Sequence, residues 1–347
     1  MTDSLGDGIA AVVMAAGMGT RLKSSRAKAL LPLCGRPIGI YALESARNAG
    51  IERVVAVVGY QADEVERALG DEWEYVLQEP LLGTGHALMS CCPNLGSFEG
   101  DLLVSYADMP LIGADCLREL VTYHRAQRAA ATVLSAIVGQ PGRLGRIVRG
   151  PEGELAAIVE AGDATEEQLT LNEINTGTYV FRSPLIFNML AKIRRDNAQA
   201  EYYLTDVIGA LATTGEKVQA LAAPRPESAM GINTRVELAS AEAIMRQRVR
   251  EQLMLSGVTL MDPVSAFIDA QVTIGADTVI YPQVVIEGRS AVGVDCVIGP
   301  CATIADSEIG DRARVCHSVL RGARVAADAQ VGPFTHLGSR EGEQARG

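Results

Sequence analysis

A loop of small residues follows a short apolar segment near the start of the chain, and its residue types suit phosphate binding. The segment Ile9–Met14 has the length and composition of a buried parallel strand. The small residues of 15–19 let the backbone bend sharply, so that its N–H groups can approach an anion closely. Thr20 adds a hydroxyl, Arg21 a guanidinium that can hold two oxygens at once, and Lys28 a mobile positive charge.

The spacing of the glycines distinguishes this loop from two common phosphate-binding motifs. Gly19 is followed by Thr-Arg-Leu, which does not fit the dinucleotide pattern G-x-G-x-x-G. The loop also lacks the Gly-Lys-Ser or Gly-Lys-Thr ending of a Walker loop. The sequence therefore favours a triphosphate site of a third kind, and an ordinary glycine-rich turn with a surface arginine is the alternative.

A carboxylate that follows another buried strand is the natural candidate for a metal ligand. Leu102–Ser105 is the predicted strand, and Asp108 comes soon after it, just before Pro110. Magnesium needs only one or two protein carboxylates when substrate phosphates supply further oxygens. The alternative role for Asp108 is to cap the helix predicted to begin near Gly113, because Asp is a favoured capping residue.

These loops need a framework that brings them together, and the alternating pattern of residues 9–235 supplies one. The predicted strands are 9–14, 53–58, 102–105, 132–138, 146–148, 156–160, 175–181 and 217–222, and the predicted helices are 37–49, 115–127, 184–194 and 204–213. The alternation predicts an α/β fold with a Rossmann-like mixed, mainly parallel sheet and helices on both faces. Ligands of such sheets bind at the carboxyl ends of the strands. We therefore expect the loop 14–21, the turn 106–108 and Glu160 to surround one cleft.

The pattern changes after residue 235, where the predicted first domain, 1–235, ends. Residues 236–257 form a predicted linker helix rich in Glu, Arg and Ala. From 258 to 338 an aliphatic residue recurs about every six positions, often before glycine, as in Ile274-Gly275 and Ile298-Gly299. Hexapeptide repeats of this kind are typical of a left-handed parallel β-helix, and the flat faces of a short one predict a homotrimer. The polar residues 339–347 form a tail suited to disorder.

The composition of the whole chain excludes several classes of protein. Its 347 residues carry a formal net charge of −11, which argues against binding to nucleic acid or to an anionic membrane. The seven cysteines form no C-x-x-C pair and the four histidines lack ligand spacing, so we expect no zinc site. No apolar run approaches the roughly 20 residues that span a bilayer, and no signal segment is evident. The composition predicts a cytoplasmic protein with reduced thiols.

Taken together, the motifs resemble those of the sugar-1-phosphate nucleotidylyltransferase superfamily, in particular the bacterial N-acetylglucosamine-1-phosphate uridylyltransferases. The resemblance covers nearly the whole chain, from about Ala10 to Leu337. The motifs that carry it are Ala-Ala-Gly-x-Gly-Thr-Arg (15–21), Leu-Gly-Thr-Gly-His-Ala (82–87), Tyr-Ala-Asp (106–108), Gly-Arg-Ile (145–147), Ile-Val-Glu (158–160), Asp-Ala-Thr (163–165), Glu-Ile-Asn-Thr-Gly (173–177), Glu-Tyr-Tyr-Leu-Thr-Asp (201–206) and Gly-Ile-Asn (231–233). The later motifs are long and favour N-acetylglucosamine over other sugars.

The resemblance implies a role for each part of the site. The implied catalytic residues are Arg21, Lys28 and Asp108. The implied nucleotide-binding residues are Met14, Ala15, Ala16, Gly17, Gly19, Thr20, Gln78, Gly83 and Thr84. The implied sugar-binding residues are Tyr106, Ala107, Gly145, Glu160, Asn175 and Thr205. The implied ligands of a magnesium ion, the cofactor of this family, are Asp108 and Asn233.

The implied reaction converts UTP and N-acetyl-α-D-glucosamine 1-phosphate into UDP-N-acetylglucosamine and pyrophosphate, a step that supplies peptidoglycan and cell-wall synthesis. The sugar phosphate is already ionised near neutral pH, so positioning and charge neutralisation are enough for its in-line attack on the α-phosphorus. The closest alternative is a uridylyl- or thymidylyltransferase acting on glucose 1-phosphate or another hexose 1-phosphate. A non-catalytic trimer that binds nucleotide sugars is the alternative from another class.

Three residues near the predicted site depart from the family pattern. Met18 stands where a basic residue is usual, Ala27 where a proline precedes the lysine, and Ala107 where a glycine precedes the aspartate. None of these removes a ligand, so we expect lower efficiency or a shifted sugar selectivity. Full-length relatives also carry an acetyltransferase on a longer β-helix. Its residues have no counterparts in this sequence, and we expect no acetyltransferase activity from this chain.

Overall fold

The computed structural model describes residues 5–6, 8–197 and 199–338, and the contacts within it divide the chain into two compact units. The N-terminal unit comprises Met1–Leu31 and Pro37–Leu238. The C-terminal unit comprises Pro32–Arg36 and Ala239–Gly347. The predicted tail, 339–347, lies outside the described residues. No described helix combines the length and the apolar composition that crossing a membrane requires.

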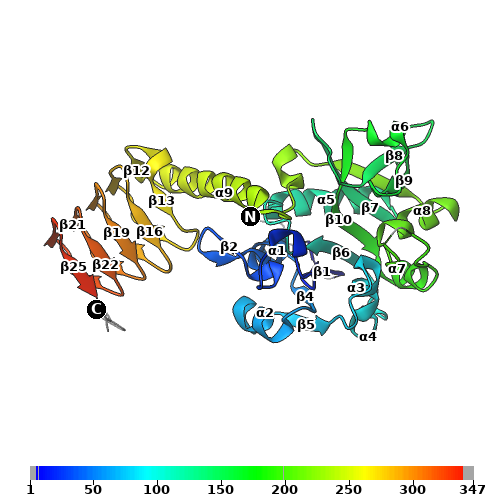
Figure 1. Cartoon of the computed structure of the whole chain (residues 1–347), viewed down its shortest axis with the longest axis horizontal. Coiled ribbons are helices and arrows are strands. Elements are labelled where there is room, and N and C mark those ends of the chain that lie inside the picture. Colours follow the sequence, from blue (N-terminus) through cyan, green and yellow to red (C-terminus); the bar gives the residue numbers. More distant parts are fainter. Residues whose placement is uncertain (1–4, 7, 198, 339–347) are drawn as a thin grey trace. The chain divides into compact units, whose positions relative to one another are not determined.

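The N-terminal unit is built on one nine-stranded sheet, in which seven strands follow the order β11-β7-β10-β6-β1-β4-β5 (Figure 1). Its strands are β1 Ile9–Met14, β4 Arg53–Val58, β5 Glu74–Leu77, β6 Asp101–Tyr106, β7 Ala131–Ile137, β8 Arg146–Arg149, β9 Leu155–Val159, β10 Glu173–Arg182 and β11 Val218–Ala222. The central strand β1 pairs in parallel with β4 and β6, so the carboxyl ends of these three strands meet at one edge. The long strand β10 runs antiparallel to both of its neighbours, β6 and β7.

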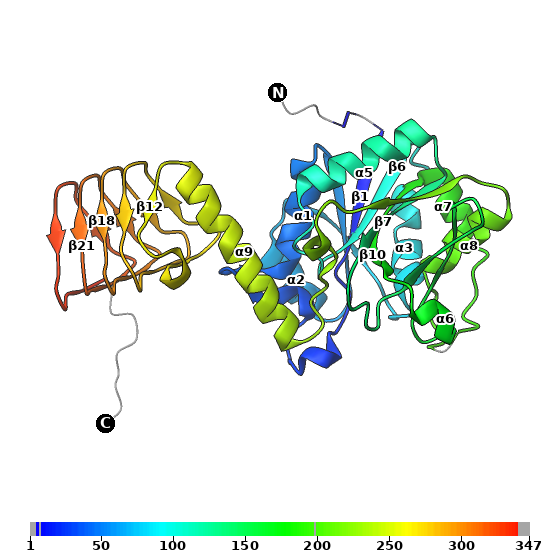
Figure 2. The ribbon, with the colours of Figure 1, turned by 90° about the horizontal axis from the view of Figure 1, so that it is seen from above.

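Helices cover both faces of this sheet. The α-helices are α1 Ile38–Asn48, α2 Ala62–Leu69, α3 Thr84–Ser90, α4 Cys92–Leu95, α5 Ala114–Gln127, α6 Glu166–Leu169, α7 Ser183–Leu190 and α8 Thr205–Thr213, and the short 3-10 helices are η1 Thr20–Leu22, η2 Lys28–Leu30 and η3 Pro226–Ala229. Figure 2 shows α1 and α5 packed together on one face, and α3, α7 and α8 on the other. This two-faced cover explains why the central strands are apolar throughout.

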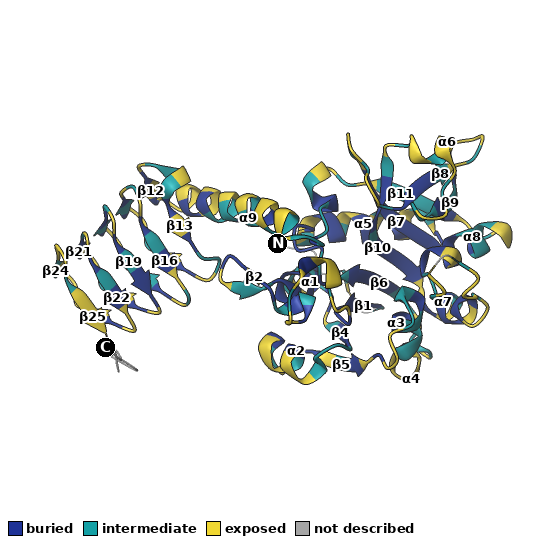
Figure 3. Ribbon diagram, viewed as in Figure 1, coloured by how far each residue is buried: buried dark blue, intermediate teal, exposed yellow. Residues whose placement is uncertain are grey.

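The core of the unit depends on the alternation of side chains along the central strands. All six residues of β1 are buried (Figure 3). Ala10, Val12 and Met14 belong to one apolar cluster with residues of α3, α7 and α8, as the period of two along a strand requires. The rings of Tyr179 and Phe181 on β10 join the same cluster, with centroids 5.5 Å apart. Each large side chain buried in this way contributes about 1.5–3 kcal/mol to folding.

The sheet and its helices confirm the predicted fold class. Five of the sheet strands and α-helices described in this unit were not predicted: α2, α3, α4, α6 and β5. Helix α3 begins inside the motif 82–87, where the glycines conceal its helical pattern. Strand β5 is short and lies at the edge of the sheet, with two of its four residues exposed. The sequence also did not predict that β10 runs antiparallel to its neighbours, because hydrophobic patterning does not determine the direction of a strand.

The C-terminal unit is a left-handed parallel β-helix, as predicted. Its three sheets have the orders β12-β15-β18-β21-β24, β13-β16-β19-β22-β25 and β14-β17-β20-β23. The strands are β12 Thr259–Leu260, β13 Phe267–Ile268, β14 Thr273–Ile274, β15 Val279–Ile280, β16 Val285–Glu287, β17 Ala291–Val292, β18 Val297–Ile298, β19 Thr303–Ala305, β20 Glu308–Ile309, β21 Arg314–Val315, β22 Val319–Arg321, β23 Arg324–Val325, β24 Gln330–Val331 and β25 His336–Gly338. The repeated aliphatic residues lie in register, so that Ile286 pairs with Ile304 and Ile304 with Leu320, all fully buried.

The boundary between the units differs from the predicted boundaries at 235 and 257. Helix α9, Arg235–Leu255, begins in the N-terminal unit and continues in the C-terminal one, together with η4, Pro263–Ser265. A hairpin of two short strands, β2 Pro32–Leu33 and β3 Arg36–Pro37, also belongs largely to the C-terminal unit. Hydrogen bonds give the reason: Ala270 N–H donates to the Cys34 carbonyl at 3.1 Å, and Cys34 N–H donates to Glu242 Oε2 at 2.8 Å. Such long-range contacts leave no periodic signal in the sequence.

Candidate active site

A cavity of about 500 Å³ opens at the carboxyl ends of β1, β5 and β6 in the N-terminal unit. Its lining residues are Met14, Ala15, Ala16, Gly17, Met18, Gly19, Thr20, Arg21, Lys28, Ala29, Gln78, Leu81, Gly83, Thr84, Ala87, Tyr106, Ala107, Asp108, Glu201 and Asn233. All nine residues predicted to bind nucleotide are among them, as are the three predicted catalytic residues and both predicted metal ligands. The loop, the turn and the distant Asn233 therefore share one cleft.

The loop 14–21 is anchored at its start by backbone hydrogen bonds to β4 and to the loop that follows β4. Ala15 N–H donates to the Val57 carbonyl at 2.8 Å, and Tyr60 N–H donates to the Ala16 carbonyl at 3.2 Å. Gly19 has a φ of +68°, and a Cβ there would lie 3.0 Å from the Cβ of Lys28. A glycine is needed at this position because its backbone is left-handed and Lys28 passes close by.

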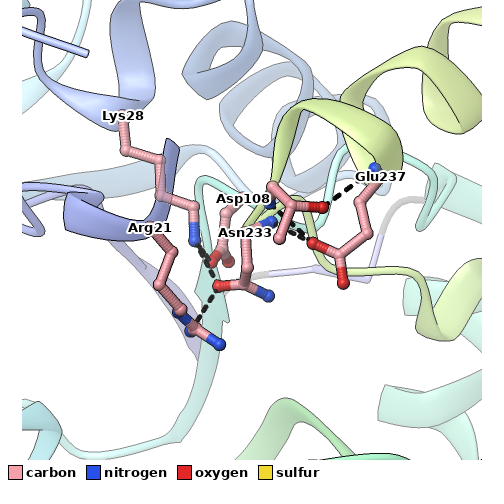
Figure 4. A network of polar contacts seen from close by, with 6 residues as sticks. Arg21, Lys28, Asp108, Asn233 and Glu237 are labelled. Atoms are coloured by element: carbon pink, nitrogen blue, oxygen red, sulfur yellow. Dashed lines mark hydrogen bonds and ion pairs between the residues drawn. The ribbon is translucent and has the colours of Figure 1, made fainter. Parts of the chain in front are cut away.

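Lys28 and Arg21 converge with Asp108 and Asn233 in a single polar network (Figure 4). Lys28 Nζ donates both to Asp108 Oδ2 and, at 2.9 Å, to Asn233 Oδ1. Arg21 Nη2 donates to the same Asn233 oxygen at 2.8 Å. The side chains of Lys28 and Asp108 are only 13% and 24% exposed, so their ion pair is shielded from water. The network holds two positive charges and one negative charge, which suits an anionic ligand.

Asp108 is positioned by the backbone of the strands around it. Ala107 N–H donates to the Met14 carbonyl at 3.0 Å, and Ile232 N–H donates to the Asp108 carbonyl at 2.9 Å. These bonds connect the end of β6 to the end of β1 and to the segment before α9. The alternative role of Asp108 as a helix cap is wrong, because α5 begins at Ala114 with Gly113 at its N-cap and no side-chain cap.

Asn233 is positioned by a residue that the sequence analysis missed. Glu237 Oε2 accepts the backbone N–H groups of Asn233 and Thr234, each at 2.7 Å. Glu237 N–H donates to Thr234 Oγ1 at 3.2 Å, which completes a capping box at the start of α9. The signal was available as Thr-Arg-Val-Glu (234–237), a Ser/Thr-x-x-Glu pattern just before a predicted helix.

The nucleotide side of the cavity is shaped by close packing around the motif 82–87. Gln78 Nε2 donates to the Gly83 carbonyl at 3.0 Å. A Cβ on Gly83 would lie 2.8 Å from the Cβ of Glu201, because the segment around Tyr202 crosses directly over this loop. Tyr202 N–H donates to the Leu82 carbonyl at 2.8 Å. Glu201, which the sequence analysis quoted only as part of a motif, lines the cavity from this crossing segment.

The six predicted sugar-binding residues fall into two groups. Tyr106 and Ala107 line the cavity, whereas Gly145, Glu160, Asn175 and Thr205 are not among its lining residues. The second group is connected internally: Thr205 Oγ1 donates to Glu160 Oε1 at 3.4 Å, and Asn175 N–H donates to the Gly145 carbonyl at 2.8 Å. Tyr106 joins the two groups, since a Cβ on Gly177, two residues beyond Asn175, would lie 3.0 Å from the Tyr106 ring.

Burial disfavours charge on one predicted sugar-binding residue from each group, Glu160 and Tyr106. The pKa of the Glu160 carboxyl is raised by burial, and the carboxylates of Asp163 and Asp206 raise it further, while the Thr205 hydroxyl opposes them. The pKa of Tyr106 is raised by burial, with Asp108 and Glu160 adding to the effect. Both shifts favour the neutral form of these groups, as burial of an acidic group does.

One of the three departures from the family pattern has a local structural explanation. The backbone N–H of Ala27 donates to Gln61 Oε1 at 2.5 Å, a bond that a proline at this position would lack. Ala107 is only 4% exposed, and a glycine there would form the same backbone bond to β1, so the structure gives no reason for the alanine. Met18 lines the cavity with a thioether in place of a cation.

The donor set near Asp108 fits a hard divalent cation completed by phosphate oxygens. No group of three or more His, Cys, Asp or Glu residues that could hold a metal exists in the described part of the chain. Asp108 Oδ2 and Asn233 Oδ1 nevertheless converge on one ammonium group, that of Lys28, so a single cation can contact both oxygens. A carboxylate and an amide oxygen are the ligand types that magnesium accepts.

Comparison with known proteins shows the family of the chain. The family model for the MobA-like NTP transferase domain matches residues 11–197. The bifunctional protein GlmU of Geobacillus sp. (strain WCH70) is 44% identical over 327 residues, which cover 94% of this chain and 71% of the relative. The chain belongs to the GlmU family. Another GlmU, from Exiguobacterium sp. (strain ATCC BAA-1283 / AT1b), is 46% identical, with 94% of this chain and 72% of the relative covered.

A comparison with solved structures finds the same fold in another protein. A crystal structure of UDP-glucose pyrophosphorylase complexed with UDP-glucose superposes with a TM-score of 0.55 and 20% sequence identity. The superposition covers 69% of this chain and 99% of that protein, and at this identity it shows a shared fold alone. With the family relationship, the chain is a nucleotidyltransferase of the sugar-1-phosphate type.

Proposed function

We propose that the chain transfers the uridylyl group of UTP to N-acetyl-α-D-glucosamine 1-phosphate, forming UDP-N-acetylglucosamine and pyrophosphate. The observation that carries the proposal is the convergence of Arg21, Lys28, Asp108 and Asn233 on the cavity beside the loop 14–21. The GlmU relatives at 44–46% identity support the choice of substrates. The product is a precursor for bacterial cell-wall synthesis in this interpretation.

The reaction we propose needs no covalent intermediate with the protein. An oxygen of the sugar 1-phosphate attacks the α-phosphorus of UTP in line, while the bond from this phosphorus to the bridging oxygen breaks. The electron pair of that bond leaves with pyrophosphate. Because the attacking phosphate is already ionised, the protein must align the two substrates and balance their charge, which preorganised cations do well.

The two cations of the network divide this work in our proposal. Arg21 presents a planar guanidinium that can hold two oxygens of the departing pyrophosphate. Lys28 balances the charge on the α-phosphate and on the attacking phosphate. Asp108 and Asn233 would hold a magnesium ion, which when bound would supply further positive charge near the phosphates of the substrates.

The remaining residues would select the substrates. Gln78 and the backbone near Gly83 offer the paired donors and acceptors that a uracil edge requires. Glu160 and Asn175 offer a carboxylate and an amide for the hydroxyl and acetamido groups of the sugar. Tyr106 lines the cavity and also packs close to Gly177, near Asn175, and it would face the sugar ring.

The decisive experiment measures pyrophosphate release by the purified chain with UTP and N-acetylglucosamine 1-phosphate. We expect release that depends on a divalent cation and stops when EDTA is added. A panel of dTTP and of glucose 1-phosphate tests the substrate choice, and a preference for glucose 1-phosphate would contradict it. Binding of the nucleotide sugar without any release would contradict the proposed activity altogether.

We further propose that the β-helix forms a homotrimer. Large apolar side chains, among them Phe267, Tyr281 and Val294, are 50%, 38% and 44% exposed in the single chain, which leaves apolar area for a partner. Sedimentation equilibrium should give three times the mass of one chain. A monomer at micromolar concentration would contradict this part of the proposal.

A further inference from the structure

Glu237 has contacts with the backbone beside the network that go beyond an ordinary helix cap. Its Oε2 accepts the N–H groups of both Asn233 and Thr234, and Figure 4 shows it beside Asn233. We infer that Glu237 is a positioning residue that holds the backbone of Asn233, so that the Asn233 side-chain oxygen stays beside Asp108. The inference rests on the proposed function, in which Asn233 is a metal ligand.

Asn233 is held from both sides along the chain. On one side, Ile232 N–H donates to the Asp108 carbonyl at 2.9 Å. This bond connects the residue before Asn233 to Asp108, the other proposed metal ligand. On the other side, Glu237 accepts the N–H of Asn233 itself at 2.7 Å. An amide oxygen on an unrestrained loop would lose conformational freedom each time a cation bound, and that loss would weaken binding. Here the two backbone bonds order the residue in advance.

A second capping box in the same unit shows which contact is unusual. At the start of α6, Gln168 N–H donates to Thr165 Oγ1 at 3.2 Å, and Thr165 N–H donates to Gln168 Oε1 at 2.9 Å. This box satisfies the N-cap residue and nothing before it. At α9, Glu237 also accepts the N–H of the residue before the cap. Capping alone does not require that extra bond, whereas positioning of Asn233 does.

The experiment compares Glu237→Ala with two controls of similar structural cost. Thr234→Ala removes the other half of the same box but leaves the carboxylate for Asn233, and Gln168→Ala removes a capping residue distant from the cavity lining. The probe is Mn²⁺ together with UDP-N-acetylglucosamine, with free Mn²⁺ measured by electron paramagnetic resonance. Thermal unfolding of each variant reports the structural cost.

We expect Glu237→Ala to weaken Mn²⁺ binding about tenfold, as loss of an outer partner of a metal ligand commonly does. The Mg²⁺ concentration for half-maximal activity should rise in parallel, while kcat at saturating Mg²⁺ stays near the wild-type value. Thr234→Ala and Gln168→Ala should lower the unfolding temperature and leave Mn²⁺ affinity unchanged. Glu237→Gln keeps an acceptor oxygen and should weaken Mn²⁺ binding by less.

Three results would overturn the inference. The first is wild-type Mn²⁺ affinity in Glu237→Ala or, if that variant does not fold, in Glu237→Gln. The second is a loss of Mn²⁺ affinity in Thr234→Ala or Gln168→Ala equal to that in Glu237→Ala. Such a result would mean that Glu237 acts only as a helix cap. The third is wild-type affinity in Asn233→Ala, which would remove the metal role of Asn233 as well. A loss in Asn233→Ala without a loss in Glu237→Ala leaves the proposed function standing and rejects the role of Glu237.

Discussion

The two units of this chain differ in how far apart in the sequence their interacting residues lie. In the N-terminal unit, the polar network joins residues 21, 28, 108 and 233, which are brought together only by the complete fold. In the β-helix, each strand pairs with another one coil away, as Ile280 does with Ile298 and Ile298 with Val315. The activity proposed for the first unit therefore depends on a few residues far apart in the sequence, whereas the stability of the second is distributed over many similar ones.

Their buried polar groups differ in the same way. In the β-helix, Ser290 Oγ accepts the N–H of Ser307 at 3.3 Å, and Ser307 Oγ accepts that of Ala323 at 3.1 Å. These hydroxyls are satisfied within the repeat and need nothing from outside. In the polar network of the N-terminal unit, Arg21 and Lys28 donate to the same Asn233 oxygen, and Lys28 also bonds to the Asp108 carboxylate. These side chains line an open cavity, so their polar groups can also contact a bound molecule.

The largest expected effect is that of Asp108→Ala. The change removes the carboxylate that would hold the metal and leaves Lys28 without its ion-pair partner. We expect turnover to fall about a thousandfold, the upper range for loss of a charged contact in the transition state. Steady-state pyrophosphate release measures it. Asp328→Ala, which removes an exposed ion pair with Arg312 in the β-helix, is the matched control and should keep normal turnover.

Lys28→Ala should have the next largest effect. It removes one of the two cations, while Arg21 remains bonded to Asn233. We expect turnover to fall about a hundredfold with the fold retained. Lys23→Ala, which changes an exposed lysine outside the cavity lining, is the control for the loss of a positive charge. Equal rates for the wild type and Lys28→Ala would remove Lys28 from the mechanism.

A smaller effect on activity, with a gain in stability, is expected for Glu160→Gln. The raised pKa of Glu160 means that its ionised form is less favourable in the folded state than in the unfolded state. The wild type should therefore lose stability relative to Glu160→Gln as the pH rises above the ordinary value of 4.5. Unfolding temperatures should differ at pH 7, with the variant higher, and converge near pH 4.

The same Glu160→Gln variant tests the proposed sugar contact. We expect the KM for N-acetylglucosamine 1-phosphate to rise about tenfold, because a hydrogen bond to a charged acceptor is weakened. The KM for UTP should stay unchanged. A higher KM for UTP alone would indicate that Glu160 contacts UTP, which would contradict the proposed sugar contact.

The smallest effect on activity is expected from a change inside the β-helix. Ile304 is fully buried and in register with Ile286 and Leu320, so Ile304→Ala should cost about 2–5 kcal/mol of stability. Urea unfolding followed by circular dichroism measures this loss. Turnover at temperatures below unfolding should match the wild type, and a large drop in turnover of the folded variant would break the contrast between the two units.

The sequence predicted the parts of this protein that local patterns encode. The repeats at Ile286, Ile298 and Ile304 follow from a period of six, and β1 follows from an apolar run before small residues. Asp108 could be placed at the sheet edge because it comes just after a buried strand. These inferences need only neighbouring residues.

The features that the sequence did not predict depend on contacts between residues far apart in the chain. Cys34 belongs to the C-terminal unit because it forms hydrogen bonds to Glu242 and Ala270, which are more than two hundred positions away in the sequence. Helix α3 was hidden by glycines that serve close packing against Tyr202. Glu237 had a readable capping signal, but its bond to Asn233 is visible only once the loop before α9 has a conformation.

The proposal on which the other predictions depend is that Asp108 and Asn233 would hold one divalent cation. A crystal structure of the chain with Mn²⁺ and UDP-N-acetylglucosamine tests it directly through the anomalous signal of manganese. The account predicts a peak within coordination distance of Asp108 Oδ2 and Asn233 Oδ1, with Lys28 turned toward phosphate. A peak elsewhere, with Lys28 still bonded to both of those oxygens, would contradict it.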